Sequence, residues 1–325
     1  MKPLSEFEII RRFFTHRAAG TTLGVGDDAA LVRVRSGMEL AVSTDMLIEG
    51  QHFLPRTDAA LLGHKALAVN LSDMAAMGAK PRWATLALAL PGADARWLAS
   101  FARGFMGLAR KHRVDLIGGD TTRGPLAICV QIMGEVPRGQ ALRRDGAKPG
   151  DEIWVSGRIG SAALALAGLQ GRLRVPPRER RALEQKLHAP EPRVSLGLQL
   201  RRVANSAIDI SDGLLADLGH ICERSNVAAV IEWEALPAMP YVRSQAQRSE
   251  VAVQALLAGG DDYELCFTAP KSQRSNVLWA AHYAKTEVML IGHVVRPGAG
   301  VPRIQLLDSI GKPLRIRSQG YDHFN

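Results

Sequence analysis

Five short apolar segments of this chain each lead into a small polar turn that contains aspartate. They read LGVGDDAAL, LAVSTDML, DLIGGDTT, AIDISDGL and LLAGGDDYEL, and a further aspartate, Asp73, lies in the helix-like stretch NLSDMAAMGA. Carboxylates at the ends of strands that share a sheet point into one crevice. There, two like charges about 4 Å apart repel by roughly 4 kcal/mol at an effective dielectric constant of about 20. Such a cluster requires bound cations, and hard carboxylate oxygens suit Mg²⁺ that is shared with substrate phosphates.

Aspartate at a turn also has a purely structural explanation. Its side chain accepts hydrogen bonds from nearby backbone N–H groups, which favours it at turns and helix N-termini. Asp58, before ALLGH, and Asp212, before GLLADLGH, are expected to cap helices in this way. A cap does not need a Gly-Gly-Asp context at a strand end, so the repeated pattern favours a metal-binding crevice.

The order of helix and strand patterns predicts an α+β chain made of two α/β domains. A length of 325 residues suits about two domains. The segment RRDGAKPGD at 143–151 is punctuated by Gly and Pro, and we place the domains at 1–138 and 139–325. Strands and helices do not alternate strictly, which argues against one doubly wound sheet. Helices are expected at 5–14, 59–78, 95–112, 161–169, 178–187, 192–203 and 214–224, and strands at 40–42, 83–90, 114–117, 126–136, 153–155, 207–210, 228–231, 265–268 and 288–295.

Composition limits the class of partner. The formal net charge of +9 indicates an anionic partner, and nucleic acid and small phosphorylated ligands fit it equally well. Aromatic residues make up 5% of the chain and are not interleaved with the arginines, as a base-stacking surface would require. No apolar run is long enough to cross a bilayer, and MKPLSEFEII does not have the pattern of a signal peptide, so no membrane partner and a cytoplasmic location are expected.

Taken in order, seven motifs resemble those of the thiamine-monophosphate kinase family, within the superfamily of aminoimidazole ribonucleotide synthetase and selenophosphate synthetase. They are GVGDDAAL, STDMLIEGQHF, KALAVNLSDMAAMGA, LIGGDTTRGPL, AIDISDGLLADLGHI, GGDDYELCF and the terminal GYDHF. The resemblance implies ATP-dependent phosphorylation of thiamine monophosphate to thiamine diphosphate. It also implies several bound Mg²⁺ ions and a homodimer in which the mixed sheets of the N-terminal domains pair, while helices cover the sheet of the C-terminal domain.

The resemblance also assigns site residues, motif by motif. The metal ligands that it implies are Asp28, Ser43, Thr44, Asp45, Asp73, Asp120, Asp209 and Asp212. Gly119, Asp120, Arg144 and Ser211 match ATP-binding positions, and His52, Asp261 and Tyr321 match positions that contact the thiamine substrate. The family usually has Glu where this chain has Asp261, so the carboxylate here is one methylene shorter.

The chemistry of this reaction explains why no general base is assigned. A phosphate monoester has a second pKa of about 6, so the attacking oxygen is largely deprotonated at neutral pH. Catalysis then consists of positioning and electrostatic stabilisation around the metal, with direct in-line transfer.

Other functions remain as alternatives. Selenophosphate synthetase is expected to have a reactive Cys near its N-terminus, and a hydrogenase-maturation relative a C-terminal Cys; here the first cysteine is Cys129 and the chain ends in YDHFN. Aminoimidazole ribonucleotide synthetase is compatible with the fold alone. A nucleic-acid-binding protein would leave the aspartate turns unexplained and would bind with a steep salt dependence.

Overall fold

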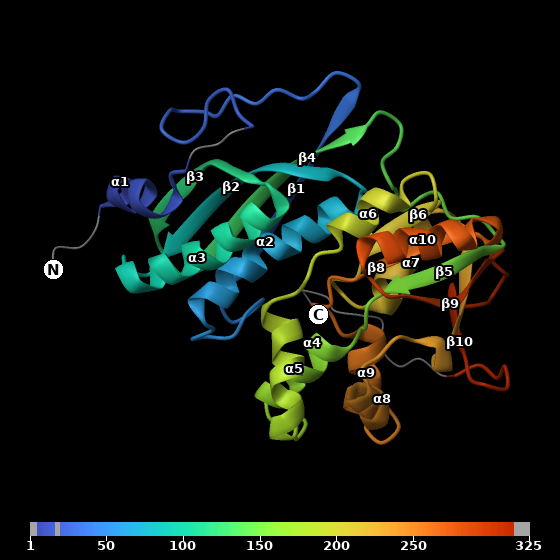
Figure 1. The fold of residues 1–325 in the computed structure, drawn as a ribbon. Helices are drawn as coiled ribbons and strands as arrows, with labels where there is room; N and C mark the ends of the chain where they lie inside the picture. Colours follow the sequence, from blue (N-terminus) through green and yellow to red (C-terminus); the bar gives the residue numbers. More distant parts are fainter. Residues whose placement is uncertain (1–4, 17–19, 315–325) are drawn as a thin grey trace. The chain divides into compact units, whose positions relative to one another are not determined.

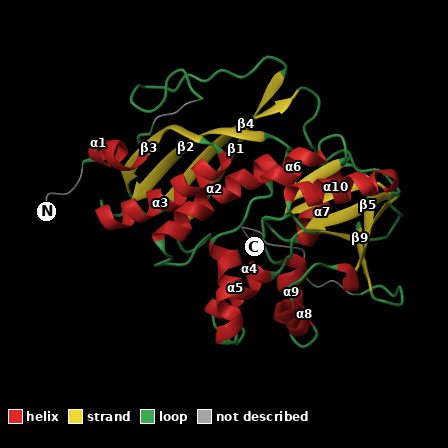
Figure 2. Cartoon of the chain, viewed as in Figure 1, coloured by secondary structure: helices red, strands yellow, loops and turns green. Residues whose placement is uncertain are grey.

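The computed structural model describes residues 5–16 and 20–314, which form two compact units (Figure 1). The first unit contains the chain up to Met74 together with Ala79–Gly139, and the second contains Ala75–Gly78 and the chain from Gln140 onward. Each unit combines a sheet with helices (Figure 2), which confirms the predicted α+β class with two α/β parts.

The first unit is built on a mixed four-stranded sheet in the order β1-β4-β2-β3. β4 is antiparallel to β1 and β2, whereas β2 and β3 are parallel. Helices α2 and α3 lie over one face of this sheet (Figure 1). The elements are α1 (Glu6–Ile9), the π-helical η1 (Ile10–Phe14), β1 (Met38–Ile48), α2 (Ala59–Ala76), β2 (Lys80–Leu90), α3 (Ala95–His112), β3 (Asp115–Arg123) and β4 (Ala127–Pro137).

Two helix starts follow from local side-chain chemistry. Ser5 and Glu8 form a capping box, in which the Ser5 side chain accepts from the Glu8 amide and the Glu8 carboxylate accepts from the Ser5 amide. The Asp58 carboxylate accepts from the amides of Ala60 and Leu61 at 2.9 and 3.0 Å. The expected cap at Asp58 is therefore confirmed.

The expectation that Ser43-Thr44-Asp45 and Gly118-Gly119-Asp120 form turns at strand ends is wrong. β1 pairs with β4 along its whole length, from Met38 opposite Pro137 to Ile48 opposite Ala127. Asp120 likewise lies within β3, opposite Ala87 of β2. Ladder hydrogen bonds on a neighbouring strand satisfy the backbone here, so the polar residues continue the strand instead of ending it.

The second unit is built on a six-stranded sheet in the order β10-β7-β9-β5-β8-β6. One face carries Ile153, Val155 and Cys266 into a buried core with α4, α5, α7, α8 and α9. Trp154 of β5 and Phe267 of β8 lie opposite each other, and their side chains point to the other face of the sheet. Helix α10 contacts β8 and α6 there. The elements are β5 (Asp151–Ser156), α4 (Ser161–Leu169), α5 (Pro177–His188), α6 (Val194–Leu200), β6 (Ser206–Asp209), α7 (Leu214–Arg224), β7 (Ala228–Glu232), the 3-10 helix η2 (Trp233–Ala235), α8 (Pro240–Ala246), α9 (Glu250–Ala258), β8 (Leu265–Pro270), the 3-10 helix η3 (Lys271–Gln273), α10 (Arg274–Ala284), β9 (Val288–Val295) and β10 (Ile304–Leu307).

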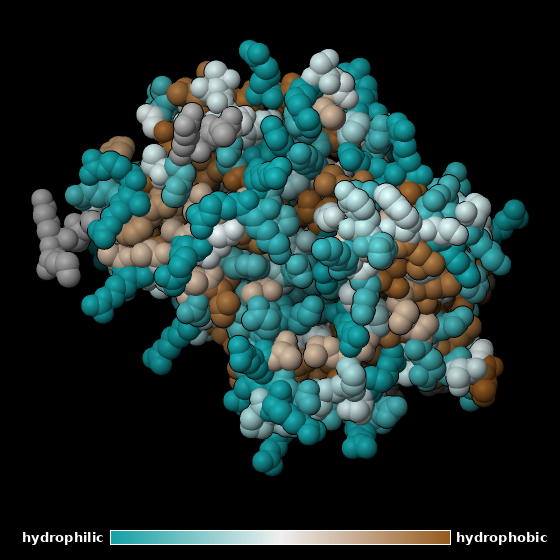
Figure 3. Space-filling view, viewed as in Figure 1, coloured by the Kyte–Doolittle hydropathy of each residue, from teal (hydrophilic) through white to brown (hydrophobic). Residues whose placement is uncertain are grey.

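The surface is mixed in character. In the view of Figure 3, hydrophilic side chains separate several hydrophobic areas. Within residues 5–16 and 20–314, no helix combines the length and apolar character that a membrane span needs.

Candidate functional site

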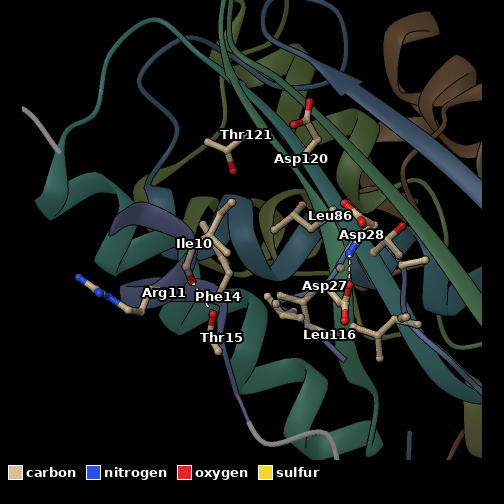
Figure 4. A pocket seen from close by; sticks show the side chains of 18 of the residues that line it. Ile10, Arg11, Phe14, Thr15, Asp27, Asp28, Leu86, Leu116, Asp120 and Thr121 are labelled. Carbon is tan, nitrogen blue, oxygen red and sulfur yellow. Dashed lines mark hydrogen bonds between the residues drawn. The ribbon is translucent and has the colours of Figure 1, made fainter. Parts of the chain in front are cut away.

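A pocket of about 790 Å³ lies in the first unit (Figure 4). It is bounded by the first helical segment, which is α1 with η1, by the loop around residues 25–30 and by strands β2 and β3. Three of the predicted site residues, Asp28, Gly119 and Asp120, line it. The complete lining is Phe7, Ile10, Arg11, Phe14, Thr15, Val25, Gly26, Asp27, Asp28, Ala29, Ala30, Thr85, Leu86, Leu116, Ile117, Gly118, Gly119, Asp120 and Thr121. The structure therefore brings one predicted metal-binding motif of the N-terminal loop together with another from β3.

The pocket wall combines carboxylates with apolar side chains. Asp27, Asp28 and Asp120 are exposed on its wall, and the Asp28 amide donates to the Asp27 carboxylate at 2.9 Å. Ile10 and Phe14, from the first helical segment, lie on the other side of the view from Asp27 and Asp28 (Figure 4). Leu86 and Leu116 lie on the side of these aspartates, and Arg11 and Thr15 lie on the side of Ile10 and Phe14 (Figure 4).

Gly119 explains the Gly-Gly-Asp sequence at the pocket. Its φ angle is +147°, a backbone conformation that residues with a side chain rarely adopt. A Cβ built on Gly119 would also lie 1.8 Å from the Leu86 carbonyl oxygen. Glycine is thus required for β3 to approach β2 at the position that precedes Asp120.

The predicted ligands on β1 divide between the two faces of the sheet. The Ser43 hydroxyl donates to the Asp73 carboxylate of α2 at 2.5 Å, and Asp45 shares the face of Ser43 because side chains alternate along a strand. Thr44 is exposed on the opposite face. The structure brings Ser43 and Asp73 together but directs the Thr44 side chain away from them.

His52 follows β1 in a short turn. Its Nδ1 accepts from the Ile48 amide at 3.1 Å, so the neutral imidazole carries its proton on Nε2. The ammonium group of Lys65, which is buried on α2, lies 3.5 Å from the His52 carbonyl oxygen. The backbone of the predicted substrate-binding residue is therefore tied to α2.

In the second unit, Asp209 ends β6, and Ser211 and Asp212 lie in the loop between β6 and α7. Asp209 is 5% exposed, while Ser211 and Asp212 are half-buried. The expected cap at Asp212 is wrong, because the N-cap of α7 is Gly213 and no side chain bonds there as a cap. The carboxylate of Asp217, one turn into the helix, accepts from the amides of residues 211, 212 and 213 at 3.1 Å each.

Asp217 holds the loop of the predicted site residues Ser211 and Asp212, and the sequence motifs did not single it out. Burial, followed by the negative charges of Asp209 and Asp212, raises the pKa of Asp217 to about 8. Its position in GLLADLGH, one turn after Asp212 and on the buried side of an amphipathic helix, was the available signal.

The remaining predicted residues have simpler surroundings. Arg144 is exposed, and its carbonyl oxygen accepts from the Ser225 hydroxyl at 2.8 Å; the neighbouring Arg143 pairs instead with Asp145. Asp261 is half-buried and has a left-handed backbone, with φ of +70°. Tyr321 lies outside the described residues.

The donor atoms in both units suit Mg²⁺. In the part of the chain that the structure describes, no group of three or more His, Cys, Asp or Glu side chains is arranged to hold a metal ion. Mg²⁺ is usually bound by one or two carboxylates, with water and substrate phosphates completing its coordination. The exposed carboxylates of Asp28 and Asp120, beside a pocket with room for a nucleotide, fit that mode.

Comparison with known proteins identifies the class to which this fold and site belong. Residues 26–136 match the family of AIR synthase related protein, N-terminal domain, and residues 148–305 match AIR synthase related protein, C-terminal domain. The chain is 45% identical over 323 residues to thiamine-monophosphate kinase of Escherichia coli (strain K12), with 98% of each chain covered.

Solved structures agree with the sequence comparison. A crystal structure of thiamine-monophosphate kinase from Stenotrophomonas maltophilia K279a is 47% identical, with a TM-score of 0.83 and with 91% of this chain and 94% of that chain covered. AaThiL complexed with AMPPCP and TMP is 29% identical, with a TM-score of 0.77 and coverage of 98% and 96%. The chain therefore belongs to the AIR synthase related proteins and, among them, to the thiamine-monophosphate kinase family.

Proposed function

We propose that this protein transfers the γ-phosphoryl group of ATP to thiamine monophosphate and so forms thiamine diphosphate. The observation that carries the proposal is a match to thiamine-monophosphate kinases along almost the whole chain, together with a pocket lined by the corresponding Asp28, Gly119 and Asp120. A relative of the same fold forms a complex with AMPPCP and TMP, which supports ATP and thiamine monophosphate as the two reactants.

The nucleotide is proposed to occupy the first-unit pocket. Its base would contact the apolar side chains of Ile10 and Phe14, and its phosphates would lie toward Asp28 and Asp120. Arg144 and Ser211 of the second unit are proposed to contact the phosphates as well, since Arg144 is exposed and permanently cationic.

Phosphoryl transfer between two anions requires charge neutralisation more than proton transfer. When bound, Mg²⁺ would supply positive charge to the phosphates of both reactants. The carboxylates of Asp28, Asp45, Asp73, Asp120, Asp209 and Asp212 and the hydroxyl of Ser43 are the proposed protein ligands. Thr44, whose side chain lies on the opposite face of the sheet, is proposed to contribute through its backbone. The substrate phosphate is already largely deprotonated at neutral pH, so these residues position the reactants for in-line attack without a general base.

Thiamine monophosphate is proposed to contact His52, Asp261 and Tyr321. The Nε2–H of neutral His52 can donate to the substrate. Asp261 offers a negative charge to the cationic thiazolium ring, and the aromatic ring of Tyr321 offers a cation–π contact of about 0.5–2 kcal/mol.

A homodimer is part of the proposal, and the uncovered face of the first sheet supports it. Leu40, Val42, Met46 and Ile48 alternate along β1 on one face and are 43%, 52%, 53% and 38% exposed. Apolar patches of this kind on an edge strand usually mark an interaction site. We assign the domain roles accordingly: residues 1–138 for dimerisation and metal–nucleotide binding, and 139–325 to complete the nucleotide and substrate site. The proposed place of action is the cytoplasm.

The direct experiment is an ADP-release assay with the purified chain. Thiamine monophosphate, thiamine and aminoimidazole precursors are compared as acceptors at saturating ATP and Mg²⁺. We expect rapid ADP release with thiamine monophosphate alone, and thiamine diphosphate as the product. Equal rates with thiamine, or activity only with an aminoimidazole precursor, would refute the proposed function.

A further inference from the structure

The segment Gly259–Glu264 between α9 and β8 is held in an unusual backbone conformation. Asp261 and Tyr263 both have left-handed backbones, with φ of +70° and +50°, although neither is glycine. Such conformations persist only where the surroundings enforce them, and they concentrate at functional sites. We therefore expect specific contacts to hold this segment in place.

Backbone contacts join this segment to the loop that precedes α7. The Asp261 amide donates to the Ser211 carbonyl oxygen at 2.9 Å, and the Tyr263 amide donates to the Ile210 carbonyl oxygen at 2.8 Å. A Cβ on Gly260 would lie 2.3 Å from the Ser211 carbonyl oxygen, which explains the second glycine of GGDDYE. Asp261 is thus placed directly beside the predicted ATP-binding and metal-binding loop.

The two buried acidic residues of the motif serve as anchors. The Asp262 carboxylate accepts from the Gly160 amide at the start of α4 at 2.7 Å, and burial raises the pKa of Asp262 well above its usual value. Glu264, with 2% of its side chain exposed, accepts from the Ser156 hydroxyl at 2.6 Å. The three acidic side chains of GGDDYE therefore divide into two anchors and one half-exposed carboxylate, that of Asp261.

Arg193 completes the anchor at Glu264. Its Nε and Nη2 donate to the two oxygens of Glu264 at 2.6 and 2.5 Å, and 11% of its side chain is exposed. Burial lowers the pKa of Arg193, but the hydrogen bonds and charge of Glu264 more than offset this, and the net shift is upward. A fork of this geometry fixes both position and orientation, which a lysine could not do.

Tyr263 acts on Asp261 itself. The Tyr263 ring is 9% exposed, and its hydroxyl donates to Asp261 Oδ1 at 3.0 Å. The backbone of Asp261 is therefore held by its hydrogen bond to Ser211, and its carboxylate is held by the Tyr263 hydroxyl.

We propose that Arg193 and Tyr263 are positioning residues for the Asp261 carboxylate, so that it meets the cationic thiazolium ring of the substrate. Arg193 acts through Glu264 by fixing the strained segment, and Tyr263 acts by orienting the carboxylate. This role rests on the proposed function. The shorter Asp261 side chain makes fixed orientation more important, because it cannot compensate for a displaced backbone by reaching further.

Tyr263→Phe is the sharpest variant, since it removes one hydroxyl and keeps the packed ring. We expect the KM for thiamine monophosphate to rise about three- to tenfold, the range for losing one hydrogen bond. The KM for ATP and the Tm should not change. The same substitution in an Asp261→Asn background should add nothing, because residues that act through one another are not additive. The matched control is Tyr241→Phe, which removes a hydroxyl that donates to the Arg174 carbonyl oxygen at 3.4 Å.

Arg193→Lys tests the second anchor. It should raise the KM for thiamine monophosphate more than the KM for ATP, whereas the control Arg274→Lys, at the pair between the partly exposed Arg274 and the buried Glu152, should change neither. Unchanged KM values for thiamine monophosphate in both Tyr263→Phe and Arg193→Lys, or a parallel rise for both substrates, would overturn the positioning role alone. A wild-type protein that releases no ADP with thiamine monophosphate would overturn the proposed function and this role with it.

Discussion

The two units place similar aspartate motifs in opposite environments. In the first unit, Asp28 and Asp120 are exposed on a pocket wall. In the second, Asp217 and Asp262 are buried and accept hydrogen bonds from backbone amides. Asp28 and Asp120 are therefore open to a cation from solvent, whereas Asp217 and Asp262 hold loops in place.

The two sheets also differ in how far their faces are covered. Helices pack on both faces of the second sheet, whereas β1 of the first sheet exposes Val42 and Met46 on the face away from Ser43 and Asp73. The first sheet thus has an open apolar face on the edge strand β1 and an exposed carboxylate, Asp120, on the opposite edge strand β3, whereas the second unit presents loops held by hydrogen bonds.

The strongest test of this difference changes the open face. Val42→Glu/Met46→Glu should raise the dimer dissociation constant by at least about 1,000-fold, because each dimer would bury four unpaired charges. Light scattering after size-exclusion chromatography measures the mass. Leu278→Glu/Trp279→Glu, at exposed apolar residues of α10 in the second unit, is the matched control. A wild-type monomer, or a variant that remains dimeric, would contradict the assignment.

Asp120→Asn should lower kcat by about 10²-fold or more while the Tm is unchanged, since under the proposed function it removes an exposed negative charge that would hold the metal. Steady-state kinetics at saturating Mg²⁺ and a thermal melt provide the two readings. Near-normal turnover would show that the exposed carboxylate of β3 is not a ligand.

Asp217→Ala should produce the opposite pattern, with a loss of about 2–3 kcal/mol in the free energy of unfolding, because three amide donors lose their acceptor. Urea denaturation measures the loss. Asp217→Asn, which retains an acceptor oxygen, serves as the control and should cost less. Equal stability of Asp217→Ala and wild type would refute the anchoring role.

Two neighbouring arginines, Arg144 and the ion-paired Arg143, test the same contrast between a group available to a ligand and one held by the protein. Arg144 is exposed, and Arg144→Ala should raise the KM for ATP about tenfold with little change in kcat or Tm, as for the loss of a charged phosphate contact. Arg143→Ala, next to it but paired with Asp145, is the control. An unchanged KM for ATP would exclude the phosphate role of Arg144.

Local signals predicted part of this structure correctly. The capping box at Ser5 and the cap at Asp58 depend on residues within three positions of each other, so the sequence contains all of their determinants. The α+β class followed from the order of apolar patterns. Site motifs were recognisable as a set, and three of the site residues predicted from them line one pocket.

Non-local pairing decided the remainder. Ser43–Asp45 became strand because β4 lies alongside, and nothing in STD itself indicates that partner. The cap expected at Asp212 was replaced by Asp217 because the packing of α7 buries the latter. Likewise, only the fold shows that Glu264 meets Arg193, 71 positions away in the chain.

The most direct measurement of the central claim is the Mg²⁺ dependence of the reaction rate for Asp28→Asn and Asp262→Asn, each compared with wild type. The account predicts that Asp28→Asn raises the Mg²⁺ concentration for half-maximal rate by at least about tenfold at an unchanged Tm. Asp262→Asn should lower the Tm and leave that concentration unchanged. Superimposable Mg²⁺ curves for Asp28→Asn and wild type, or a shifted curve for Asp262→Asn alone, would contradict the division between the metal-binding role of exposed Asp28 and the loop-holding role of buried Asp262.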